Sequence, residues 1–192
     1  ELSAAAALLR GQEKFPEGTR FVYLELAEPP KDVVRSWTPG ADWDRQARAV
    51  LRNPRERATY EAVVSLSSGS LLSWRHVEGV LPPMTAEEVM ACEDVVRADE
   101  RWQAAMRARG VEDFSLVMLD PWASGYTGPD DDPGGRRLAR PLTFVRSEPD
   151  DNGYARPAEG LIVTVDLDTM TVLDVADHGV VPLPPQPGNY LP

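Results

Sequence analysis

The feature that most constrains the fold is a β-hairpin pattern that ends in prolines. In residues 161–175, branched apolar residues alternate with polar ones on both sides of an interruption at Asp168 and Thr169. This alternation is typical of two antiparallel strands with one face turned inward. Residues 180–185 (VVPLPP) follow, and we expect an exit strand whose prolines keep it out of the middle of a sheet.

The same pattern occurs about 100 residues earlier, so the chain contains an internal repeat. Val64, Leu66, Leu71 and Leu72 correspond to Val165, Leu167, Val172 and Leu173, and Gly79-Val80-Leu81-Pro82 corresponds to Gly179-Val180-Val181-Pro182. Residues 21–29 also resemble 114–121, and residues 45–53 resemble 136–146. We therefore predict two copies of one unit, residues 1–82 and 83–185, followed by a terminal segment 186–192. The double proline at 82–83 favours an extended connector between them.

Each copy is predicted to be one helix followed by four antiparallel strands, an α+β fold. In the first copy we expect a helix at 2–10, strands at 20–27 and 46–51, a hairpin at 60–77, and a loop at 30–44. In the second, Thr85 and Glu88 have the spacing of a capping box, and an apolar stripe through Cys92 and Trp102 predicts one helix to Gly110. Glu87 and Glu88 are expected on the helix exterior. Strands at 114–119 and 137–146 alternate with loops at 120–135 and 147–159, and the hairpin closes the copy.

Charge is concentrated in the second copy. Residues 1–83 hold 11 basic and 11 acidic residues, whereas residues 84–192 hold 9 and 20, so the net charge of -11 belongs to the second part. Nucleic acid is excluded as an expected partner, because phosphate binding needs concentrated positive charge. The excess favours solubility, or attraction of a cationic substrate. Only two of the basic residues are lysines, a bias that suggests a G+C-rich, bacterial genome.

Few residues have the chemistry of a catalytic or metal centre. Cys92, on the predicted helix, is interpreted as a buried small hydrophobe, and His76 and His178 lack a neighbouring histidine at metal-ligand spacing. We therefore expect no catalytic, cofactor-binding or metal-binding residue in this chain. The apolar run at 4–9 is too short to span a membrane and lacks an export pattern, so a cytoplasmic location without membrane contact is expected.

Several ordered segments together resemble the N-terminal region of the copper-containing amine oxidases. They are Glu28-Pro29-Pro30-Lys31, Pro121-Trp122 with Gly125-Tyr126, Arg140-Pro141-Leu142-Thr143-Phe144, Asp151-Asn152 with Tyr154-Ala155-Arg156-Pro157, Glu159-Gly160-Leu161, and Gly179-Val180-Val181-Pro182 with Gly188-Asn189-Tyr190. The resemblance spans nearly the whole chain. In that family two small cystatin-like α+β domains precede a large catalytic β-sandwich, which agrees with the repeat and makes residues 186–192 the linker to the catalytic domain.

The resemblance implies a parent enzyme that oxidises primary amines to aldehydes, with release of ammonia and hydrogen peroxide. Its cofactors would be copper and topaquinone, a quinone made from one of its own tyrosines, and it would be a homodimer. The family binds copper through three imidazoles, more than this chain contains. Asn189-Tyr190 is followed by Leu191 and not by the acidic residue of the cofactor motif. The chain alone is therefore expected to be inactive.

By the same resemblance, Trp122, Tyr126 and Leu161 occupy positions of side chains that line the substrate channel. The expected role of the chain is to pack on the catalytic domain and to help form the route taken by the amine. Residues alone leave two alternatives open. One is a free-standing helix-on-sheet module that binds another protein, and the other is an independent enzyme with an unrecognised site.

Overall fold

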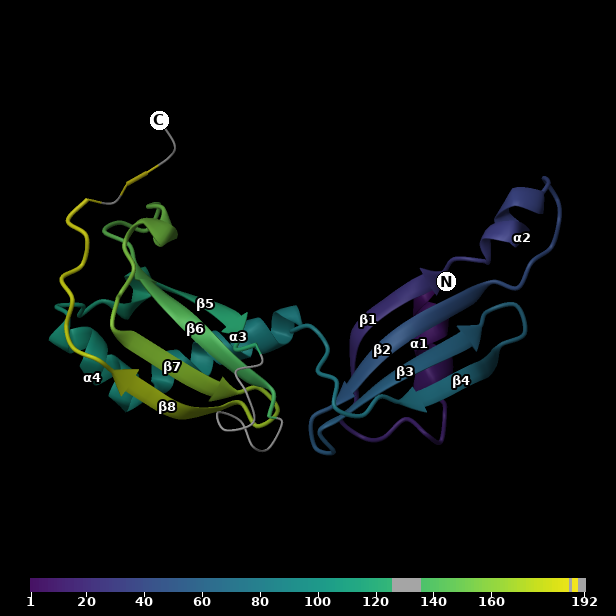
Figure 1. Cartoon of the computed structure of the whole chain (residues 1–192), viewed down its shortest axis with the longest axis horizontal. Coiled ribbons are helices and arrows are strands. Elements are labelled where there is room, and N and C mark those ends of the chain that lie inside the picture. Colours follow the sequence, from purple (N-terminus) through teal and green to yellow (C-terminus); the bar gives the residue numbers. More distant parts are fainter. Residues whose placement is uncertain (126–135, 187, 190–192) are drawn as a thin grey trace. The chain divides into compact units, whose positions relative to one another are not determined.

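The expected α+β fold is confirmed. The computed structural model describes residues 1–125, 136–186 and 188–189, and the chain divides into two compact units, Glu1–Pro83 and Met84–Pro192. Each unit contains a four-stranded antiparallel sheet in sequential order, β1-β2-β3-β4 in the first and β5-β6-β7-β8 in the second (Figure 1). The two sheets have the same topology, as the internal repeat predicts.

The first unit packs one helix on the inner face of its sheet (Figure 1). Its elements are α1 (Leu2–Arg10), β1 (Arg20–Ala27), α2 (Lys31–Ser36), β2 (Gln46–Asn53), β3 (Ala58–Ser65) and β4 (Ser70–His76). Leu9 of α1 is completely buried against inward side chains of the central strands, including Ala49, Leu51 and Val64. Because these positions alternate along β2 and β3, the intervening side chains point away from the helix.

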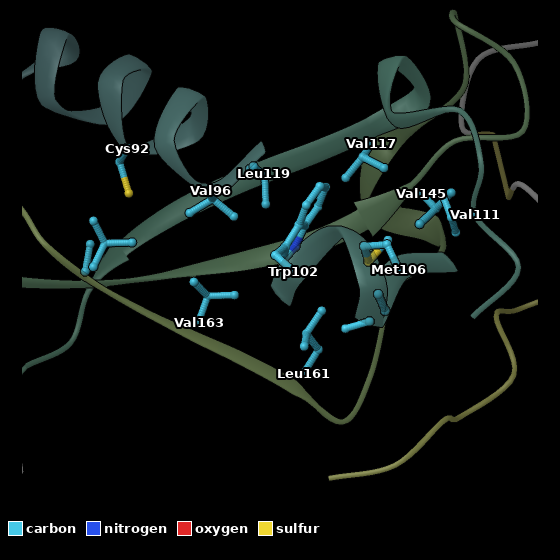
Figure 2. Packing of buried hydrophobic residues seen from close by; sticks show 14 of the residues in the cluster. Cys92, Val96, Trp102, Met106, Val111, Val117, Leu119, Val145, Leu161 and Val163 are labelled. Carbon is cyan, nitrogen blue, oxygen red and sulfur yellow. The ribbon is translucent and has the colours of Figure 1, made fainter. Parts of the chain in front are cut away.

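The second unit has the larger core. Its elements are α3 (Ala86–Ala98), α4 (Glu100–Ala108), η1 (Phe114–Leu116), β5 (Val117–Ala123), β6 (Leu138–Val145), η2 (Gly153–Ala155), β7 (Leu161–Asp166) and β8 (Thr171–Asp177). Figure 2 shows Trp102, Met106 and Leu161 in this core, which is formed by the two helices and the inner face of the sheet. Trp102 is the largest fully buried side chain.

Four expectations about secondary structure differ from the structure. The segment expected to be a loop contains α2, whose six residues bury no side chain and therefore give no periodic signal. The single long helix is interrupted at Asp99, which is extended and accepts hydrogen bonds from the backbone N–H groups of Arg101 and Trp102 at 2.9 and 3.2 Å, so it caps a second helix. Strand β5 begins later than expected and extends to Ala123, because an edge strand tolerates Pro121.

The fourth difference concerns the exit segment, which forms no strand although residues 178–186 are described. Buried Arg109 donates to the Gly179 carbonyl at 2.9 Å and pairs with Asp177 at 2.8 Å. Further along, Arg156 donates to the Pro184 carbonyl at 2.8 Å. Two arginine side chains therefore donate to carbonyl groups of the exit segment, in the place of N–H groups from a neighbouring strand.

Glu88 is buried and not exterior, which corrects the expectation for this residue. Its side chain and that of Arg137 are each 4% exposed, and they form two hydrogen bonds of 2.9 and 3.1 Å. The same carboxylate accepts from the Thr85 backbone N–H at 2.8 Å, and Thr85 accepts from the Glu88 N–H at 3.2 Å. The predicted capping box is thus confirmed, with a buried ion pair added to it.

Candidate functional site

The structure does not bring the predicted channel residues together. Trp122 lies near the end of β5 and is 61% exposed, Leu161 begins β7 and is buried in the core, and Tyr126 lies outside the described residues. The register connects Ala123 through β6 to Val165. Because Leu161 precedes Val165 by four residues, roughly 13 Å of strand separates it from the end of the sheet where Trp122 lies.

Trp122 belongs instead to the face of the second sheet that points away from α3 and α4. We name this the outer face of the second sheet, and it comprises Met118, Asp120 and Trp122 of β5, Arg140, Leu142 and Phe144 of β6, Ile162 and Thr164 of β7, and Asp174 and Ala176 of β8. The alternate residues of these strands, such as Leu119 and Val163, are buried in the core (Figure 2). Trp122, Leu142 and Ile162 are exposed large hydrophobic side chains.

Asp120 is the charged group beside the aromatic side chains of this face. Its carboxylate accepts a hydrogen bond from the Trp122 indole at 3.0 Å. The negative charge of Asp120, with a smaller contribution from burial, raises the pKa of the Tyr154 phenol. The Tyr154 ring packs edge-on against Phe144, with ring centroids 5.1 Å apart. Two aromatic side chains from different segments therefore converge on one carboxylate.

Tyr154 was missed by the sequence reasoning because it lies in a segment expected to be a loop. The short helix η2 places it, and Asn152 caps η2 by accepting from the Tyr154 N–H at 3.1 Å. Gly153 lets η2 lie close to β5, since a Cβ at that position would lie 2.5 Å from the Met118 sulfur and the methionine side chain would have to move. The available signal was Asn152 in an N-cap position before an aromatic residue.

The last described residues are tied to the same segment. Asn152 donates its backbone N–H to the Asn189 side chain at 2.6 Å, and Asn189 donates to the Asp151 carboxylate at 2.8 Å. Hydrogen bonds to Asp151 from Asn189 and from two backbone N–H groups lower its pKa. The chain is therefore held beside η2 as it approaches its last residues.

The described residues do not fit a copper centre with three imidazoles. The sequence holds two histidines, and both are exposed: His76 ends β4 of the first unit and stacks on Tyr60, and His178 follows β8 of the second. Across residues 1–125, 136–186 and 188–189, no three His, Cys, Asp or Glu side chains are grouped to hold a metal ion. Cys92 is buried, as predicted, and burial raises the pKa of its thiol to about 12.

The outer face of the second sheet thus offers aromatic and aliphatic contact area together with the charged side chains of Asp120, Arg140 and Asp174, chemistry suited to contact and binding. None of the helices in the part of the chain that the structure describes has the length and hydrophobicity needed to span a bilayer.

Comparison with known proteins identifies both units. Residues 1–74 match the family model described as AGAO-like N2 domain, and residues 87–190 match Copper amine oxidase, N3 domain. The chain is 40% identical to a primary amine oxidase of Arthrobacter sp. (strain P1), over all of this chain and 29% of the relative. It is 36% identical to the peroxisomal copper-containing diamine oxidase 1 of Nicotiana tabacum, over 96% of this chain and 28% of that protein.

The structural comparison agrees with this result. A copper-containing benzylamine oxidase from Hansenula polymorpha has a similar fold, with a TM-score of 0.77 and 20% identity over 94% of this chain and 30% of that one. This chain spans less than a third of the length of these relatives. The family resemblance deduced from the sequence motifs is confirmed, and the chain belongs to the copper amine oxidases, of which it comprises the N-terminal N2 and N3 domains.

Proposed function

We propose that this chain is the accessory region of a primary-amine oxidase, that it packs on the catalytic β-sandwich domain, and that it forms part of the wall along which the amine travels. The parent enzyme would oxidise a primary amine with dioxygen and water to an aldehyde, ammonia and hydrogen peroxide. Copper and topaquinone would supply the redox chemistry in the catalytic domain, and the parent would be a homodimer.

The observation that supports this proposal is the exposed aromatic surface around Trp122. An indole held by Asp120 and placed near the end of an edge strand has a fixed position, so it can limit the width of a passage and exclude water from it. Tyr126 remains in the proposal from the family resemblance, although it lies outside the described residues. The channel role of Leu161 stays a prediction, and its burial in the core does not favour it.

The test compares two tryptophan variants of the full-length parent enzyme. Trp122→Ala removes the proposed wall residue, and Trp37→Ala is the matched control, because Trp37 is a similarly exposed tryptophan (49%) in the first unit. We measure kcat/KM by peroxide release for methylamine and for benzylamine, a narrow and a wide amine. If Trp122 limits width, its removal shifts the ratio of the two values by about tenfold, the size of effect that one pocket contact produces.

The control is expected to leave the ratio unchanged. Equal ratios for Trp122→Ala, Trp37→Ala and the unaltered enzyme would contradict the channel role of Trp122. Absence of any peroxide release from the copper-loaded parent with a panel of primary amines would contradict the proposed activity itself.

A further inference from the structure

The internal repeat allows one unit to serve as the reference for the other. Both sheets have the same strand order and bury the same kind of inner face, so their outer faces are equivalent surfaces built on one template. A difference between these outer faces is therefore not required by the fold. A difference in side-chain character between the two outer faces is therefore better explained by what each face contacts in the parent protein.

The outer face of the first sheet is polar. It comprises Tyr23 and Glu25 of β1, Arg48 and Val50 of β2, Glu61 and Val63 of β3, and Ser73 and Arg75 of β4. Glu25 pairs with Arg48 and accepts a hydrogen bond from the Tyr23 hydroxyl at 2.6 Å, and Glu61 pairs with Arg75 across the neighbouring strands. Cross-strand ion pairs of this kind are typical of a solvated sheet face.

The outer face of the second sheet carries more large exposed hydrophobic side chains. Trp122, Leu142 and Ile162 are each close to half exposed or more, and Tyr154 adds a fourth exposed side chain at the edge. Several large exposed apolar side chains gathered on one sheet face are typical of interaction sites. The Trp122 indole already donates to Asp120, so the patch can be covered without leaving that N–H group unpaired.

Two observations identify what covers this face. First, the chain spans 29% of a relative to which it is 40% identical, so most of a comparable parent lies outside these residues. Second, Asn189, at the end of the described chain, is hydrogen-bonded to Asp151 and Asn152, and the adjacent helix η2 carries Tyr154 onto the outer face. The last described residue therefore lies beside the segment that carries Tyr154 onto the outer face.

We infer that the outer face of the second sheet is the surface that packs against the part of the parent enzyme after residue 192, whereas the outer face of the first sheet stays in solvent. This inference rests on the proposed function, because it specifies which surface makes the proposed contact with the catalytic domain. Its interface combines aromatic and aliphatic side chains with Arg140, which lies opposite Trp122 on the neighbouring strand, and aromatic residues and arginine are enriched in protein interfaces.

The test is hydroxyl-radical labelling of the full-length enzyme and of chain 1–192, read by mass spectrometry at single side chains. Tyr154 and Tyr23 form a matched pair, because they have the same chemistry and similar exposures of 58% and 50% but lie at the outer faces of different sheets. We expect labelling of Tyr154 to fall about fivefold or more in the full-length enzyme, as for a side chain at an interface. Labelling of Tyr23 is expected to be the same in both proteins.

The possible outcomes separate this inference from the proposed function. Protection of Tyr23 with no protection of Tyr154 would overturn the assignment of the face and leave the packing function standing. Protection of neither residue would overturn the inference, and the same labelling pattern at every side chain of the two proteins would overturn the packing function as well. Protection of Tyr154 that rises with the concentration of chain 1–192 and is absent from the full-length enzyme would assign the face to a second copy, and would also overturn the inference.

A substitution gives an independent measurement. Leu142→Asp places a charge in the middle of the outer face of the second sheet. Leu72→Asp is the control, because it places the same charge at a similarly exposed leucine (48% against 49%) at the irregularity in β4 of the first unit. In the full-length enzyme we expect Leu142→Asp to restore Tyr154 labelling to the level seen in chain 1–192, and Leu72→Asp to have no effect. Circular dichroism of each variant of chain 1–192 verifies that the units still fold, and unchanged Tyr154 protection in a folded Leu142→Asp enzyme would contradict the inference.

Discussion

Replacing Glu88 by glutamine tests whether the buried ion pair or the capping box stabilises the second unit. The amide oxygen of the new side chain can still accept the hydrogen bond from the Thr85 N–H, so the cap is retained while the charge is lost. Removing one partner of a buried pair costs about 3–5 kcal/mol, because the other charge stays buried without its counter-ion. Both side chains are 4% exposed, so we expect Glu88→Gln to lower the free energy of unfolding of the second unit by about 3 kcal/mol.

Companion variants separate the contributions. Thr85→Ala removes only the other half of the cap and is expected to cost about 1 kcal/mol. Arg48→Ala breaks a solvent-exposed pair with Glu25 in the first unit and is expected to cost less than about 1 kcal/mol. Combining Glu88→Gln with Arg137→Met removes both charges, so the double variant is expected to be less destabilised than the sum of its two single variants.

The assay must report on one unit at a time, because two units need not unfold in one transition. Native-state hydrogen exchange in increasing urea gives the opening free energy at the core amides of β6 and β7, and the amides of β2 and β3 serve as the internal control. If Glu88→Gln lowered the opening free energy by less than about 1 kcal/mol, the reasoning would be refuted, because the Glu88–Arg137 pair would then be no stronger than a surface ion pair. Strict additivity with Arg137→Met would refute it as well.

Two further predictions concern the exit from β8. A hydrogen bond from Arg109 lowers the pKa of Asp177 from 3.8 to about 2, so the ionised carboxylate stabilises the fold fully above pH 4 and this contribution is lost as the pH falls through 2. In Asp177→Asn the stability of the second unit should therefore depend less on pH between 4 and 2, as measured by circular dichroism during acid titration. An unchanged titration profile would contradict this. Gly160→Ala should lower stability by about 1–3 kcal/mol in urea titration, because the new Cβ would lie 2.6 Å from the Gly179 carbonyl at a φ of 73°; a neutral effect would contradict the close approach.

Features with a local cause were predictable from the sequence. The Thr85 and Glu88 spacing gave the start of α3, the alternation in residues 161–175 gave β7 and β8, and the repeat gave the second sheet of identical topology. Each depends on residues within a few positions of one another, or on a copied segment. The fold class followed from these signals alone.

Features that depend on distant partners were not predictable in the same way. The burial of Glu88 requires Arg137, 49 residues later, and a capping-box glutamate without such a partner lies in solvent. The site has the same character, because Tyr154 reaches Phe144 and Asp120 only after η2 has folded over the sheet. Family resemblance pointed to Trp122, but the strand that positions it was expected to end before it.

The contrast between the two outer faces explains why the internal repeat predicts the fold of both units but not their surfaces. Inner-face residues such as Ala49 and Val163 must fill a space bounded by a helix, so packing keeps both copies alike. Outer-face residues meet no such demand from their own unit, and they can change from the ion pair of Glu25 and Arg48 to the exposed rings of Trp122 and Tyr154 without altering the topology. Two units of the same fold can therefore differ in function through the surfaces that do not pack in their own cores. In this chain the surface that differs is the outer face of the second sheet.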